Sequence, residues 1–185
     1  VSELSRWDRL RDRAVPRGFA RLVFGVTGFS YVVVYLGAYV QHLGVQLACL
    51  DWPLCNGQLF PGLAGGQGTV FIHRFAAAML TGGIIWMFVW ARRMRRARPD
   101  LYWGSVAALV LVFIQALEGA YIVFSRLDLF STLAHGAFVS LLFGSLCYLC
   151  LHVLPRPEAV RQAERARRAP HRAATVRRRV RAQSM

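Results

Sequence analysis

The sequence contains no lysine, so arginine alone supplies its positive charge. It has 23 arginines against 9 acidic residues, which gives a net charge of +14. A nucleic-acid binder can be this basic, but it has a folded soluble body, which a chain that is 56% hydrophobic does not show. Nearly all arginines lie in three blocks, at 6–21, 92–98 and 156–181. This segregation predicts a polytopic membrane protein with no nucleic-acid partner.

Charge is almost absent from four long apolar stretches, each close to the ~20 residues that a membrane helix needs. These stretches are 22–40, 75–91, 101–124 and 129–154. Glu118 is the single charged residue within them. The sequence therefore predicts an all-α fold, a polytopic membrane four-helix bundle.

Arginine is also missing from two of the connections between these stretches. The connection 41–69 has none and 125–130 has only Arg126, whereas the third connection and both ends are arginine-rich. Because arginine-rich segments stay on the cytoplasmic side, both termini are expected to be cytoplasmic. The predicted parts are a cytoplasmic segment 1–20, a four-helix transmembrane domain 21–154 with an outer loop 41–69, and a basic cytoplasmic tail 155–185. We expect a multi-pass protein of a prokaryotic cell (inner) membrane, its tail held by anionic lipid.

Two histidines within the apolar stretches match in position. His73 lies near the outer start of the second predicted helix and His135 near the outer start of the fourth. Both helices run inward from the same face, so a rise of ~1.5 Å per residue brings the imidazoles to nearly equal depth. Ionisable residues inside a membrane are usually functional, and imidazole is a common axial ligand of heme iron. The pair predicts a bis-histidine heme site, with two interfacial histidines bonded to backbone as the alternative.

Other residues near this site allow two interpretations each. Arg74 can pair with a heme propionate or extend to the lipid headgroups. Glu118, with Gln115 one turn earlier on the same face, can take up protons near the heme or form a hydrogen bond between helices. Small residues permit close approach of either helices or a flat ring. They are Gly82, Gly83, Gly119, Gly136 and Gly144.

The chain has only 4 cysteines. Cys49 and Cys55 lie in the predicted outer loop, where an oxidising compartment favours a disulfide, structural or redox-active. A metal site is less favoured there, because only His42 is near. Cys147 and Cys150 form a C-x-x-C within the fourth stretch, which no histidine follows directly. That spacing excludes c-type heme attachment and predicts ordinary packing.

The loop residues form a longer pattern that resembles a known family. It comprises Gly37-Ala38-Tyr39-Val40, Gly44, Leu47, Cys49, Asp51-Trp52-Pro53-Leu54-Cys55 and Gly57. This run resembles the first-loop signature of the heme A synthases, and His73-Arg74 resembles their second-helix motif. Further matches in their third and fourth helices are Gln115, Gly119, Val123 and His135. The resemblance covers residues 18–154.

The resemblance implies an oxidoreductase that converts heme O to heme A, oxidising a methyl group to a formyl group for cytochrome oxidases. The usual member has eight helices in two similar halves, each with a histidine pair. One half takes the substrate heme and the other takes heme b, so the expected cofactor at His73 and His135 is heme b, heme O or both. The family also implies a Cys49–Cys55 disulfide on the substrate half.

The chain departs from the family pattern in two ways. It matches only the first half, so we expect a homo-oligomer to supply both heme sites. Val70 stands where the family motif Glu-x-x-His-Arg has an acid that assists oxidation, which leaves Glu118 as the candidate catalytic residue. Candidate partners are heme O, heme O synthase and terminal oxidase assembly factors. The alternatives are a catalytically silent bis-histidine cytochrome b-type electron-transfer or respiratory-complex subunit, or a heme carrier.

Overall fold

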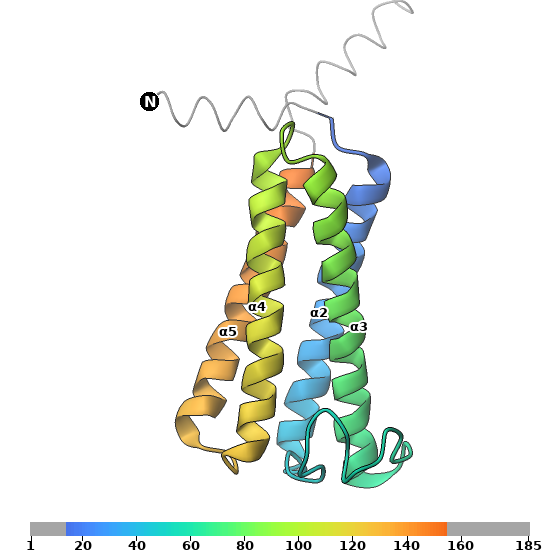
Figure 1. Ribbon diagram of the computed structural model, residues 1–185, viewed down its shortest axis with the longest axis vertical. Helices are drawn as coiled ribbons and strands as arrows, with labels where there is room; N and C mark the ends of the chain where they lie inside the picture. Colours follow the sequence, from blue (N-terminus) through green and yellow to red (C-terminus); the bar gives the residue numbers. More distant parts are fainter. Residues whose placement is uncertain (1–13, 155–185) are drawn as a thin grey trace, which may run out of the picture. The chain divides into compact units, whose positions relative to one another are not determined.

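The computed structural model of the chain describes residues 14–154 (Figure 1). Its helices are α2 (Arg17–His42), α3 (Gly65–Arg93), α4 (Pro99–Phe124) and α5 (Leu129–Val153). All four are long and apolar enough to cross a membrane. The first part of the predicted cytoplasmic segment, residues 1–13, and the tail from residue 155 lie outside the described residues.

The four helices alternate in direction and form a closed ring. Helix α2 packs against α3 and α5, and α4 packs against the same two neighbours. The long connection between α2 and α3 therefore lies at the same end as the short connection between α4 and α5 (Figure 1). The connection between α3 and α4 lies at the other end, which we call the inner end. The predicted all-α four-helix bundle is confirmed.

The core of the bundle is a single apolar cluster to which every helix contributes. Its fully buried members include Phe19, Ile84, Leu101 and Leu146, one from each helix. Gly104 lets α4 and α5 approach closely, because a Cβ there would lie 2.7 Å from Cδ2 of Leu149. Many large apolar side chains remain exposed on the outside, as expected of helices that face lipid.

Helix α3 begins earlier than the sequence pattern predicts. The apolar pattern begins near Val70, but the helix begins at Gly65, which has a positive φ of 66°. A side chain at Gly68 would clash with the backbone of Leu63. The close approach of these two backbone segments therefore requires a glycine at position 68. The glycine-rich first turn carries no apolar signal. The consequence is that His73 lies in the third turn of α3 and not in the first.

A buried ionic network closes the inner end. Arg98, which precedes α4, donates from Nε to Oδ1 of Asp100 at 3.0 Å and from Nη2 to Oδ2 at 2.7 Å. The same Nη2 donates to the backbone carbonyl of His152 at 2.7 Å, and Nδ1 of His152 lies 2.9 Å from Asp100 Oδ2. Arg98 and Asp100 are 2% and 1% exposed. This network fixes the start of α4 to the end of α5 and gives His152 a specific partner.

We expect Asp100→Ala to destabilise the bundle by about 3–5 kcal/mol, because it leaves Arg98 buried without its counter-charge. Asp128→Ala is the matched control. Asp128 is exposed before α5 and accepts one hydrogen bond from the Ser131 amide, so its loss should cost only about 1 kcal/mol. Unfolding of the purified protein in detergent, followed by circular dichroism, measures both. Equal effects of the two variants would contradict a stabilising role for the network.

Candidate functional site

The two predicted histidine ligands come from opposite corners of the helix ring. His73 lies in the third turn of α3 and His135 in the second turn of α5, both counted from the loop end. Both side chains are half-buried, and they are close enough to interact electrostatically. The structure therefore brings together two imidazoles from helices that are not neighbours in the ring.

Each histidine lies against a glycine of an adjacent helix. A Cβ added at Gly37 of α2 would lie 3.0 Å from Cε1 and 3.5 Å from Nε2 of His73. A Cβ at Gly119 of α4 would lie 3.7 Å from Cε1 of His135. Glycine at these two positions removes the side chains that would otherwise fill the space beside the rings. Sequence reasoning noted Gly119 among several glycines and gave Gly37 no role beyond the family pattern.

The Nδ1 atoms of both histidines are buried and have no hydrogen-bond partner. The Val33 carbonyl faces His73, but it makes no well-formed hydrogen bond with Nδ1. Burying an unpaired polar atom is unfavourable, and such exceptions in a folded protein need a reason. Two imidazoles with unpaired Nδ1 atoms, each beside a glycine, suit a flat group whose metal needs axial nitrogen ligands.

The donor set also restricts what such a metal could be. Within residues 14–154, no group of three or more His, Cys, Asp or Glu side chains is placed to hold a metal ion. A zinc site built from side chains alone needs three or four such ligands. Two imidazoles fit a metal that brings its equatorial ligands with it, as iron does in heme.

Helix α4 contributes two polar residues on the His135 side. Gln115 donates from Nε2 to the backbone carbonyl of His135 at 2.9 Å, which holds α5 in register with α4 at this level. Glu118 is half-buried and interacts electrostatically with His135. The only acid of the predicted spans thus lies beside one of the two candidate ligands.

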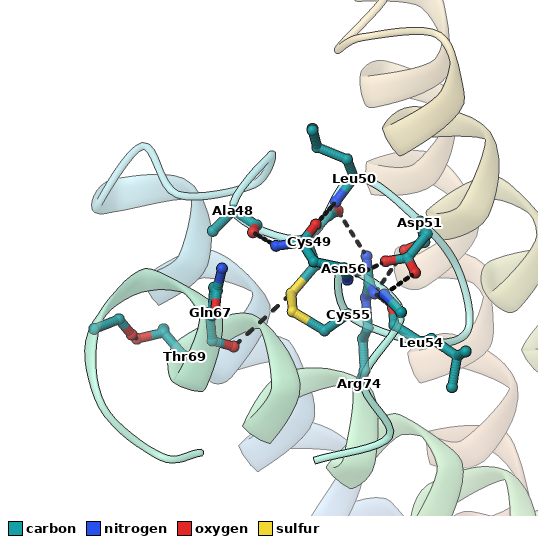
Figure 2. The surroundings of a disulfide bond; sticks show 12 residues. Ala48, Cys49, Leu50, Asp51, Leu54, Cys55, Asn56, Gln67, Thr69 and Arg74 are labelled. Atoms are coloured by element: carbon teal, nitrogen blue, oxygen red, sulfur yellow. Dashed lines mark hydrogen bonds between the residues drawn. A yellow bond between two sulfur atoms is a disulfide. The ribbon is translucent and has the colours of Figure 1, made fainter. Parts of the chain in front are cut away.

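Arg74, next to His73, is directed into the outer loop (Figure 2). Its Nη1 donates to the carbonyl of Asp51 at 2.9 Å and to that of Leu54, and its Nη2 donates to the carbonyl of Cys49 at 3.3 Å. The guanidinium has five N–H donors, so some remain for another acceptor. In the structure these hydrogen bonds of Arg74 hold the loop against α3.

The loop itself is a compact hairpin around a disulfide (Figure 2). Cys55 and Gln58 exchange backbone hydrogen bonds across Asn56 and Gly57, which have positive φ values of 52° and 76°. Asn-Gly is the preferred pair for such a tight turn. The carboxylate of Asp51 accepts the amides of both turn residues, at 2.5 Å from Asn56 and 2.7 Å from Gly57. These bonds, with that of Gly57 foremost, hold the pKa of Asp51 below its ordinary value.

The Cys49–Cys55 disulfide is present and lies on the inside of this loop. The two cysteines are 0% and 3% exposed and pack with Val40 of α2 and Val70 of α3. Val70 therefore lies between the disulfide and the turn that carries His73. The free cysteines Cys147 and Cys150 are half-buried in α5, as the packing interpretation predicts.

Comparison with known proteins identifies relatives of this chain. Residues 2–147 match the model of a family described as "Cytochrome oxidase assembly protein". The chain belongs to this family. It is 40% identical over 141 residues to the heme A synthase of Symbiobacterium thermophilum, covering 76% of this chain and 46% of the relative. The heme A synthase of Halalkalibacterium halodurans is 37% identical over 146 residues, covering 79% and 49%. That of Bacillus licheniformis is 42% identical over 134 residues, covering 71% and 44%.

Family membership and the four membrane-length helices establish a multi-pass membrane protein of the bacterial cell membrane. The chain spans about half the length of the heme A synthases that it matches. The resemblance predicted from the loop and the histidines is therefore confirmed at the level of the family.

The carboxylate of Asp51 supports a prediction about pH. Because its pKa is lower in the folded loop than its ordinary value of 3.8, the carboxylate stabilises the loop above that value. The stabilisation is lost as the pH falls through the lower folded pKa. Hydrogen exchange of residues 48–58, measured for the wild type and Asp51→Asn at each pH, tests this. We expect faster exchange in the variant at neutral pH, and no difference once Asp51 is protonated.

Amide exchange depends on pH even in an unfolded chain. Comparing the wild type with Asp51→Asn at the same pH removes this dependence from the difference between them. Asp128→Asn, outside the loop, is the control and should not change the exchange of residues 48–58. A difference between wild type and Asp51→Asn that persists unchanged in strong acid would contradict the assignment to this carboxylate.

Proposed function

We propose that His73 and His135 bind heme iron as its two axial ligands. The observation that carries the proposal is the pair of half-buried imidazoles whose Nδ1 atoms are buried without a hydrogen-bond partner, each ring beside a glycine of a neighbouring helix. Coordination through one ring nitrogen would leave the other as an N–H donor, and metal-bound histidines almost always pair that nitrogen with an acceptor. The Val33 carbonyl is a candidate acceptor for His73, since it already faces the ring.

The other residues of the site have supporting roles in this proposal. Gly37 and Gly119 leave the space beside the rings, and Gln115 fixes the backbone that carries His135. Arg74 holds the outer loop over the site and uses a remaining donor for a heme propionate. When bound, the heme supplies the porphyrin methyl group and the redox-active iron of the reaction.

For the activity we propose a heme A synthase-like oxidation of the methyl group of heme O to the formyl group of heme A. Supporting this are the family match and the heme A synthases among its relatives. Oxidation of the methyl group with water to a formyl group releases protons and electrons. An external electron acceptor takes the electrons, and Glu118 beside His135 is the proposed proton acceptor. A second four-helix unit, from another copy of this chain, would supply the partner heme site. The loop end faces the outside, with both termini and the arginine-rich inner connection in the cytoplasm.

The ligand assignment predicts a low-spin heme spectrum that depends on both histidines. Purified wild type should show sharp reduced α and β absorption bands, and His73→Ala or His135→Ala should abolish six-coordinate binding. His42→Ala is the matched control, because His42 is exposed at the end of α2. Spectra unchanged in both single variants would refute the assignment.

A second pair of variants tests the space beside the ring without replacing a ligand. Gly37→Leu should lower heme loading strongly, because its side chain would occupy the space at His73. Gly28→Leu on the same helix should not, since a Cβ there meets nothing within 4 Å. Equal loading of the two variants would place the heme elsewhere.

One observation favours a different function. Val70, which is 4% exposed and packed against the disulfide, occupies the position of the family acid. A site without that acid suits a catalytically silent cytochrome b-type subunit or a heme carrier, both of which need binding and no proton acceptor.

Co-expression with a source of heme O, followed by pigment extraction and mass spectrometry, separates these functions. Heme A indicates an enzyme, heme b alone indicates a cytochrome, and bound but unchanged heme O indicates a carrier. If the chain is an enzyme, Glu118→Gln should keep heme loading and lower heme A production, because it removes the proton site and preserves size. Val70→Glu should raise production. Full heme A production by Glu118→Gln would exclude Glu118 from the reaction.

A further inference from the structure

An apolar groove lies between α2 and α3 toward the inner end, separate from the histidine pair. Its volume is about 490 Å³. Helix α2 contributes Gly18, Arg21 and Gly25 to its lining, and α3 contributes Gly83, Trp86 and Trp90. The groove is open because glycines have no side chains to fill it. A Cβ at Gly25 would meet nothing within 4 Å. At Gly18 it would lie 2.9 Å from the Trp90 ring, which forms the wall at the inner end.

The groove has the length of one leaflet. Its lining on α2 runs from Gly18 to Phe29, which is about 16 Å at ~1.5 Å per residue. The hydrocarbon core of a bilayer is about 30 Å thick, so the groove covers roughly half of it. A partner helix would cross both leaflets and need a continuous face, whereas an acyl chain occupies only one leaflet.

The inner end of the groove is positively charged. Arg21 is exposed there, and within residues 14–154 no acidic side chain pairs with it. A second hollow of about 380 Å³, at the inner end of α3, is lined by Val89, Arg92, Arg93 and Arg95. In the part of the chain that the structure describes, no acidic residue lines either hollow. Exposed indole rings such as that of Trp86 are typical of the level where lipid headgroups begin.

We propose that this groove binds an anionic phospholipid, with one acyl chain along Gly25 and Gly83 and the phosphate at Arg21. Arginine suits phosphate because its planar guanidinium donates two parallel hydrogen bonds. The apolar wall selects an acyl chain, and Arg21, which pairs with no acidic side chain of residues 14–154, selects a negative headgroup. The site makes no use of the heme residues, so it stands independently of the proposed function.

Native mass spectrometry of the full chain, released from micelles with equal phosphatidylglycerol and phosphatidylcholine, tests the proposal. The wild type should retain one phosphatidylglycerol. Gly25→Leu should lose it, because the leucine would occupy the groove, where its Cβ would meet nothing within 4 Å. Gly28→Leu, equally exposed on α2 but outside the groove, should retain it. Loss of lipid from both leucine variants, or from neither, would overturn the site.

The charge is tested by Arg21→Gln, with Arg17→Gln on the same helix as control. One arginine near the headgroups contributes on the order of 1 kcal/mol, so Arg21→Gln should lower the preference for phosphatidylglycerol about fivefold. Arg17→Gln should leave most of the preference for phosphatidylglycerol unchanged. Equal retention of both lipids by the wild type would overturn the proposal. A Gly25→Leu variant that changes the oligomeric mass while lipid retention stays constant would assign the groove to a second copy of the chain.

Discussion

Within a membrane, polar groups must find their partners inside the protein, and this constraint shapes the whole bundle. The serine and threonine hydroxyls of the four helices donate to backbone carbonyls one turn earlier, as Thr27 does to the Val23 carbonyl at 2.8 Å and Ser105 to the Leu101 carbonyl at 2.8 Å. The buried charges of Arg98 and Asp100 pair with each other. Against this background the unpaired Nδ1 atoms of His73 and His135 are exceptions. That contrast is the physical argument that the bundle is built around another group.

Both ends of the bundle are closed by an arginine that binds backbone carbonyls of another segment. At the loop end Arg74 binds three carbonyls of the disulfide hairpin, and at the inner end Arg98 binds the carbonyl of His152 as well as Asp100. Several donors on one rigid plane let a single residue fix a segment that has no regular structure of its own. The helix ends are thereby held in place, which in turn fixes the depth of the two histidines.

The sequence predicts the helices well because lipid enforces their length and composition, and three of the four stretches match the observed helices within a few residues. It fails at the start of α3, where glycine-rich backbone carries no hydropathy signal. The matched positions of His73 and His135 are visible in the sequence, since depth depends only on counting residues along helices of known direction. The roles of Gly37 and of the Arg98–Asp100–His152 network are not visible, because each depends on which helices are neighbours. Arg74 shows the same limit: its position is predictable, but its loop partners are set by the fold of the hairpin.

The residue at position 70 affects this loop as well as any chemistry. Val70 and Arg74 are four residues apart on one face of α3, where side chains meet. A carboxylate at position 70 would compete for the guanidinium that here binds the carbonyls of Cys49, Asp51 and Leu54. With valine there is no competitor in that turn, and the apolar side chain packs on the disulfide instead. In this chain Arg74 binds the loop carbonyls and Val70 packs on the disulfide, so the closure of the loop needs no acid at position 70. The proton acceptor proposed for the oxidation, Glu118, lies on α4, so loop closure and proton transfer use separate residues in the proposed function.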